Sequence, residues 1–306
     1  MASLSLPGGS LRVLDRRRVI QSLGLLTAAP WLARAESTSP ATPLPLPLHV
    51  RELVNHIGTS VADVTRSATF YSHLFQSGTI LGQEKPALRY EINFHPGALS
   101  IGPLRASGAG AATQPYIDHF CILASPFDAA AWRARLDAEK LQHFAGGSFV
   151  VIGGVSVQLF GGRAAPPPSK TRPAGAAGGG FKPMAPLFSG QPIVSPHGFE
   201  HLTLDVADLD SSAALFERLF GLTPQAPTSG LRVFRVADIR LELREARSGE
   251  RPRIKGFAIR VAPYDPGRVR AALEDLGAKV ETSERSRQRM SLRFADPDGI
   301  SCELWV

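Results

Sequence analysis

One stretch of the chain occurs twice, and this repeat limits the possible folds more than any other feature. Residues 199–221 begin as an alternating strand, turn at an Ala-Asp pair, and continue as an amphipathic helix that should stop at Gly221. Moving back 145 positions places residues 56–75 on residues 201–220 with eight identities. A repeat of this length indicates duplicated supersecondary units.

A second repeat alternates with the first. Residues 120–136 fall on residues 257–273 at an offset of 137, with seven identities. The first and third units of the chain therefore match each other, as do the second and fourth. Each unit has the pattern of a strand, a helix and further strands, so the simplest account is a duplicated pair of βαβββ modules.

The composition sets the boundaries between these pairs. Residues 163–197 are crowded with Pro and Gly and are predicted to be a linker or a long mobile loop. The first module pair is then residues 51–162 and the second is residues 198–306. Each contains about 110 residues, which is enough to bury a core of its own.

The first 35 residues have the pattern of an export signal. A basic cluster, Arg16-Arg17-Arg18, precedes a short apolar run, and Ala33-Arg34-Ala35 provides a small-x-small cleavage site. The cluster resembles a twin-arginine signal; an ordinary secretory signal or a disordered basic tail are the alternatives. Residues 36–50 form a Pro-rich, extended lead-in. We therefore expect contact with an export machinery and a periplasmic or secreted product.

Charge and cysteine content exclude some classes of function. Cleavage after Ala35 removes five Arg and one Asp, so the net charge falls from +7 to +3, which gives little reason to expect a nucleic-acid partner. Cys121 and Cys302 lie in apolar strand-like runs, as two buried small residues would. No other apolar stretch is long enough to span a membrane. A homodimer stays open.

The strand beginnings VNHIGTSVADV, IDHFCIL and FEHLTLDVADL, with the ending DPDGISCELWV, resemble the vicinal oxygen chelate superfamily. That superfamily includes glyoxalases, extradiol dioxygenases and bleomycin-resistance proteins. The resemblance implies an α+β fold in which four βαβββ modules form two paired-module open barrels. It also implies a divalent metal on the floor of a barrel: Fe, Mn, Zn, Ni or Co.

The resemblance places metal ligands on the first and last strands of each module. The amino-terminal pair then offers His56, His119 and Gln158, and the carboxy-terminal pair offers His201, Glu242 and Glu303. The carboxy-terminal set is preferred because two carboxylates partly neutralise a divalent ion. Pairing of modules across the halves stays open. The remaining ligand positions carry Gly102 and Gly256, so neither half has the two-histidine, one-carboxylate triad of extradiol dioxygenases.

Two classes of function follow. The first is a metal-dependent glyoxalase- or dioxygenase-like enzyme, a lyase, isomerase or dioxygenase, that acts on a small substrate with two adjacent oxygens. Glu303 and Glu242 would then be catalytic residues that carry protons. The alternative is a metal-free protein of the bleomycin-resistance type that binds a small molecule, and the ligands missing at Gly102, Gly256 and Gln158 favour it.

Overall fold

The computed structural model describes residues 48–75, 79–83, 88–94, 96–104, 106–107, 110–111, 113–125, 127–161, 182–184, 187–226, 228–281 and 291–306. The predicted export signal, most of the Pro-rich lead-in and most of the predicted linker lie outside these ranges. None of the helices within them is long and apolar enough to cross a membrane.

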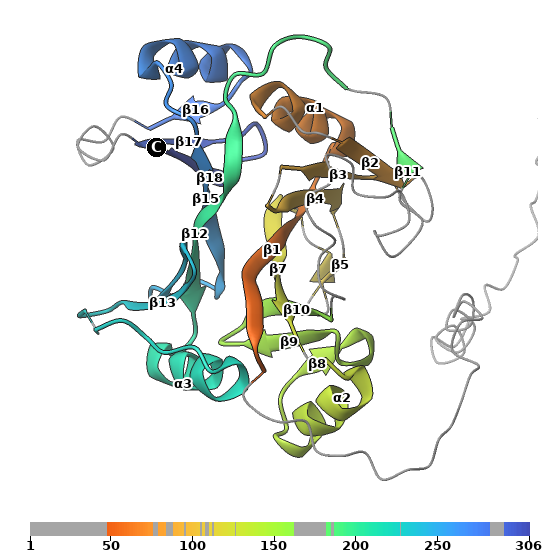
Figure 1. The fold of residues 1–306 in the computed structure, drawn as a ribbon, viewed down its shortest axis with the longest axis vertical. Helices are drawn as coiled ribbons and strands as arrows, with labels where there is room; N and C mark the ends of the chain where they lie inside the picture. The colour runs from red at the N-terminus through yellow and green to blue at the C-terminus, as the bar shows by residue number, and fades with distance from the viewer. Residues whose placement is uncertain are drawn as a thin grey trace, which may run out of the picture. The chain divides into compact units, whose positions relative to one another are not determined.

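The amino-terminal half contains two modules (Figure 1). The first comprises β1 (Val50–Val61), α1 (Val64–Leu74), β2 (Thr79–Gln83), β3 (Arg89–Asn93) and β4 (Ala98–Pro103). The second comprises β7 (Tyr116–Ala124), α2 (Ala129–Ala138), β8 (His143–Phe144), a 3₁₀ turn (Ala145–Gly147), β9 (Phe149–Ile152) and β10 (Val155–Gly161). A small hairpin, β5 (Ala106–Ser107) and β6 (Gly110–Ala111), lies between them in the chain.

The carboxy-terminal half repeats this order after β11 (Lys182–Pro183). Its first module comprises β12 (Pro196–Val206), α3 (Leu209–Phe220), β13 (Arg232–Val236) and β14 (Ile239–Glu245). Its second comprises β15 (Arg253–Val261), α4 (Pro266–Asp275), β16 (Lys279–Val280), β17 (Ser291–Ala295) and β18 (Ser301–Trp305). The predicted α+β architecture is confirmed, and the sheet has the curl of the vicinal oxygen chelate fold.

The helices begin for the same local reason in all four modules. Each follows an aspartate whose side chain accepts hydrogen bonds from backbone N–H groups of the first turn, which would otherwise lack partners. These N-cap residues are Asp63, Asp128, Asp208 and Asp265. The helix α3 ends where the sequence predicted, at Gly221, which adopts a left-handed conformation with φ of 64°.

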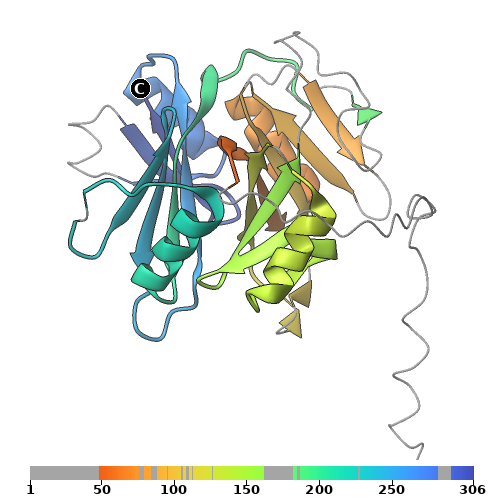
Figure 2. The same cartoon turned by 60° about the horizontal axis from the view of Figure 1, so that its bottom comes forward.

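The first strands of consecutive modules pair within each half. The strand β1 runs antiparallel to β7, and β12 runs antiparallel to β15. Each first strand also pairs in parallel with the last strand of its own module: β1 with β4, β7 with β10, β12 with β14 and β15 with β18. First and last strands therefore lie at the centre of each half, where residues from two modules can meet, and Figure 2 shows the strands curling around that centre.

The two halves exchange contacts through their helices. Tyr71 on α1 donates a hydrogen bond to Asp296 Oδ2 (2.8 Å), and Ser67 donates to Asp298 (2.5 Å), in the turn between β17 and β18. At the start of α3, the N–H of Ala207 donates to the carbonyl of Gly153 (2.9 Å), in the turn between β9 and β10. Each half thus supports the first helix of the other.

Burial changes the acidity of the groups at the first of these contacts. Asp296 is 3% exposed, and burial raises its pKa to about 6 despite hydrogen bonds that it accepts from Tyr71 and from backbone N–H groups. Burial, together with the neighbouring Asp296, also raises the pKa of the Tyr71 hydroxyl well above its usual value. At the contact between Tyr71 and Asp296, burial therefore favours the neutral forms of both the phenol and the carboxyl.

Candidate metal centre

Three side chains converge on the inner face of the amino-terminal half. His56 on β1 lies opposite Cys121 on β7, which in turn lies opposite Gln158 on β10. His119 lies on β7 two residues before Cys121, opposite Gly58. The two Nε2 atoms of His56 and His119 are 3.3 Å apart, and Gln158 Oε1 is 2.9 Å from His56 Nε2. The structure thus brings together all three predicted residues of this half.

These distances fit a shared metal ion. Two ligands bound at about 2.1 Å to one metal lie about 3.0–3.4 Å apart at octahedral or tetrahedral angles. Each Nδ1 atom of the pair faces an oxygen: Asp118 Oδ2 is 2.9 Å from that of His119, and Asn55 Oδ1 is 3.4 Å from that of His56. With Nδ1–H donated to these oxygens, both Nε2 atoms present lone pairs at the same point, which a cation stabilises.

A glycine gives His119 the space it needs. Gly58 lies opposite His119 on β1, and a Cβ atom at this position would come within 2.2 Å of the imidazole Cε1. On the other side, the ring of Phe149 makes an edge contact with His119 at 5.1 Å between centroids, and Phe144 stacks on Phe149 at 4.7 Å. The imidazole of His119 therefore lies between Gly58 on β1, which has no side chain, and the ring of Phe149.

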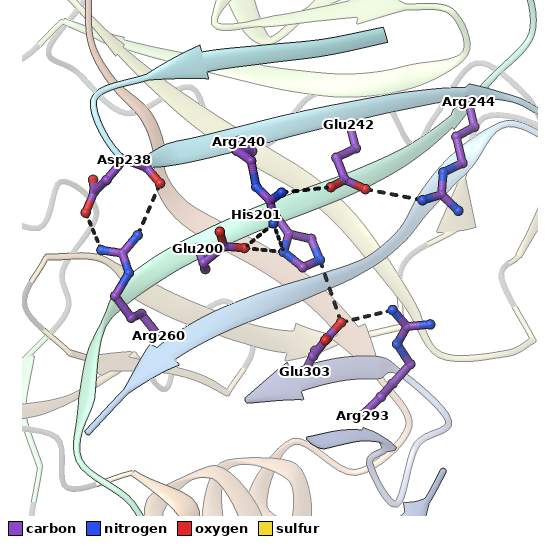
Figure 3. Close-up of polar contacts among 9 residues, drawn as sticks. All are labelled: Glu200, His201, Asp238, Arg240, Glu242, Arg244, Arg260, Arg293 and Glu303. Carbon is purple, nitrogen blue, oxygen red and sulfur yellow. Dashed lines mark hydrogen bonds and ion pairs between the residues drawn. The ribbon is translucent and has the colours of Figure 1, made fainter. Parts of the chain in front are cut away.

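The carboxy-terminal half places His201 and Glu303 in the same row (Figure 3). His201 lies opposite Ala258, which lies opposite Glu303. The nearest contact is 3.8 Å, from His201 Nε2 to Glu303 Oε2. Glu200 bonds the Nδ1 atom of His201. Burial alone would raise the pKa of Glu200, but hydrogen bonds from His201 and Arg240 reverse this and lower it.

Arginines bind the carboxylates of this half, as Figure 3 shows. Arg293 donates to Glu303 at 2.9 Å, and Glu242 lies between Arg240 (3.9 Å) and Arg244 (3.3 Å). The Arg240 guanidinium also lies over the ring of Trp305, 5.3 Å from its centroid. The two carboxylates therefore already have cationic partners, so the predicted set of His201, Glu242 and Glu303 does not fit a metal as it stands.

The fourth position of this half is closed to a larger side chain. Gly256 is the counterpart of His119, and a Cβ atom there would lie 2.8 Å from the carbonyl oxygen of Ser301 on β18. Over the described part of the chain, no three or more His, Cys, Asp and Glu residues are grouped as a metal site. The amino-terminal set has two histidines, and its third member is the amide of Gln158.

The register also corrects one assignment and adds residues that the repeat did not reveal. Glu242 faces Thr203, which faces Gly256; the matching row of the first half is Ser100, Gly58 and His119. Ser100, rather than Gly102, therefore occupies the last-strand position of the first module. Asn55, Asp118 and Glu200 were also missed, although each directly precedes a predicted histidine, which is a signal that the sequence does contain.

Burial of the carboxy-terminal site shifts one further group. Tyr264 lies close enough to Glu303 to be affected by its charge, and burial followed by that charge raises the pKa of the Tyr264 hydroxyl to about 12. The phenol is therefore neutral throughout the physiological range. The buried Tyr264 and the ion pair between Glu303 and Arg293 show that polar groups are packed together in the interior of this half.

Comparison with known proteins agrees with this architecture. Residues 198–304 match the model of the Glyoxalase/Bleomycin resistance protein/Dioxygenase superfamily. No curated protein matches the sequence.

Solved structures with a similar fold share little sequence with the chain. A fusion of a xylose isomerase-like TIM barrel with 4-hydroxyphenylpyruvate dioxygenase is 11% identical with a TM-score of 0.53; the match covers 88% of this chain but only 51% of that one. The 2,3-dioxygenase LapB from Pseudomonas sp. KL28 is 14% identical (TM-score 0.55, 85% and 93% covered). The Mn(II)-bound glyoxalase from Novosphingobium aromaticivorans is 13% identical (TM-score 0.52, 84% and 82% covered).

These likenesses concern the fold, and the match to the superfamily model concerns the second half of the chain. Residues 198–304 therefore resemble the Glyoxalase/Bleomycin resistance protein/Dioxygenase superfamily in sequence, and the chain has the vicinal oxygen chelate fold.

Proposed function

We propose that the protein is a metal-dependent enzyme whose metal lies in the amino-terminal half. The observation that supports this is the position of His56 Nε2. It lies 3.3 Å from His119 Nε2 and 2.9 Å from Gln158 Oε1. Two imidazoles and an amide leave part of the coordination sphere to a substrate with two adjacent oxygens. Solved proteins of this fold include a glyoxalase that holds Mn(II) and a 2,3-dioxygenase.

The residues of the chain would divide the work as follows. His56, His119 and Gln158 would hold the ion, which when bound acts as a Lewis acid toward the substrate oxygens. Glu91 on β3 lies in the row that runs through Ser100 and Gly58 to His119, and it is the carboxylate of this row that would take or return a substrate proton. Glu242 and Glu303, predicted to carry protons, belong to the other half and are bound to arginines.

Metal analysis of the purified full-length protein tests this proposal. We expect about one divalent ion per chain, either as isolated or after incubation with Fe²⁺, Mn²⁺ or Zn²⁺ under anaerobic conditions. Oxygen uptake with catechol-type compounds and isomerisation of α-ketoaldehyde adducts would then separate dioxygenase from glyoxalase-type chemistry. Failure to bind any of these ions would remove the proposed function.

A metal-free binding protein is the second candidate. The carboxy-terminal half favours it, because arginines bind Glu242 and Glu303, two residues that the resemblance assigns as metal ligands. If this reading applied to the whole protein, small-molecule ligands would bind with equal affinity before and after treatment with a chelator. The two candidates thus differ in their response to metal removal.

We also propose that the enzyme acts after export, on the basis of the twin-arginine-like cluster and cleavage site in residues 1–35. The amino terminus of protein recovered from the periplasm should then begin at or close to Glu36. A product that retains residues 1–35 and stays in the cytoplasm would contradict export.

A further inference from the structure

A register shift precedes each histidine that faces the interior of a half. Along β7, the pairing with β1 skips Asp118, which is left as an extra residue directly before His119. Along β12, the pairing with β15 skips Glu200 directly before His201, and the pairing of β1 also shifts just before His56. These irregularities are β-bulges. The shift before His201 corresponds to the one before His56, and the shift at Asp118 corresponds to the one that skips Lys255 on β15.

The bulges explain an otherwise unexpected contact. Consecutive residues of a regular strand point to opposite faces of the sheet, so their side chains do not meet. An extra residue turns its side chain toward the same face as the next one. Asp118 thereby reaches the Nδ1 atom of His119 at 2.9 Å, and Glu200 reaches that of His201.

We propose that Asp118 is a positioning residue that prepares His119 for metal binding; this rests on the proposed function of the amino-terminal half. By accepting a hydrogen bond from Nδ1–H, its carboxylate selects the tautomer in which Nε2 carries a lone pair. That lone pair points toward His56 Nε2, 3.3 Å away. A charged acceptor also makes the imidazole a stronger electron donor.

Neighbouring side chains contact both members of the Asp118–His119 pair. The Tyr116 hydroxyl donates to the other oxygen of Asp118 at 3.2 Å, and Phe149 contacts the edge of the His119 ring. Behind His56, the amide oxygen of Asn55 lies 3.4 Å from Nδ1. The two imidazoles are therefore unequal, and the acceptor behind His119 is the closer and the charged one, which makes Asp118 the residue to test.

The first measurement needs no metal. In the full-length protein stripped with a chelator, long-range ¹H–¹⁵N spectra of the histidine rings should show His119 as the Nδ1–H tautomer. In Asp118→Ala, the other tautomer should become populated. Asp118→Asn should largely keep the original tautomer, because its amide oxygen can accept the same hydrogen bond, as that of Asn55 does for His56.

The second measurement is the affinity for Co²⁺, followed by its visible absorption bands. Asp118→Ala should weaken binding about 10–100-fold, the usual cost of losing an outer partner of a ligating histidine, and Asp118→Asn should recover part of that loss. Should the alanine variant fail to fold, Asp118→Ser, which is too short to reach Nδ1, replaces it. The control is Glu200→Gln, which changes the carboxylate behind Nδ1 of His201 in the carboxy-terminal half and should leave Co²⁺ affinity unchanged.

The outcomes separate the two proposals. An unchanged His119 tautomer in Asp118→Ala, or a change in Co²⁺ affinity as large in Glu200→Gln, would overturn the role of Asp118. If the wild-type protein binds no Co²⁺ but the tautomer responds to Asp118, the proposed enzyme function fails while the role of Asp118 in fixing His119 stands.

Discussion

Replacing either His56 or His119 with alanine should remove the bound metal. Each substitution leaves one imidazole and the amide of Gln158, whose neutral oxygen binds transition metals weakly. The loss should exceed the roughly 10–100-fold that follows removal of an outer partner, so less than a tenth of the wild-type metal should remain after gel filtration. Elemental analysis of the purified variants against the wild type measures this.

The carboxy-terminal half provides the control for this experiment. His201→Asn changes the equivalent histidine, whose neighbours Glu200 and Glu303 are already bound to arginines. This variant should keep the wild-type metal content. Metal lost from His201→Asn and retained by His119→Ala would assign the site to the carboxy-terminal half and reverse our proposal. Thermal unfolding of each variant identifies any loss that reflects unfolding alone.

The second large effect concerns stability against pH. The pKa of Asp296 is about 6 in the folded protein and 3.8 as a free side chain. Between these values the native state holds a proton that the unfolded chain has lost, so the free energy of unfolding falls as the pH rises through this window. Two pKa units correspond to roughly 3 kcal/mol. Because pH 4.5 already lies above 3.8, urea denaturation at pH 4.5 and at pH 7 should reveal about two thirds of this decrease, roughly 2 kcal/mol, from Asp296.

The variant Asp296→Asn isolates that contribution. The asparagine oxygen can still accept from the backbone N–H groups of Asp298 and Ile300, which now donate to Asp296 Oδ1. It has no charge to lose, so the variant should lack the decrease in stability between pH 4.5 and pH 7. Equal slopes for the wild type and Asp296→Asn would show that another group carries the pH dependence.

The repeat in the sequence was sufficient to predict the modules, because strand alternation, aspartate caps and helix periodicity are local signals. It also placed Glu242 on the strand next to that of His201 and Glu303 one strand further away, beyond β15. The sequence offered Arg240 and Arg244 as partners for Glu242, which the structure confirms, but it did not indicate Arg293 as the partner of Glu303. Arg240 and Arg244 were visible as neighbours of Glu242, but whether a charge pairs with them or a metal depends on the curvature of the sheet.

The β-bulges could not be predicted from the sequence, for a related reason. An extra residue on one strand is defined only against its partner, so Asp118 looks like an ordinary strand residue until β1 is placed beside β7. The choice of Ser100 over Gly102 has the same origin. Both errors concern one or two residues of register, which in a sheet decide the face on which a side chain lies.

The exchange of helix contacts between the halves has a consequence for dissecting the protein. A fragment that ends after β10 would leave the Tyr71 hydroxyl and the face of α1 around it bare, because their partners, Asp296 and Asp298, are in the missing half. The carboxy-terminal half thus supports α1 of the amino-terminal half, which carries His56 and His119. A duplicated module pair can therefore be needed for assembly through the contacts that it provides to the other copy.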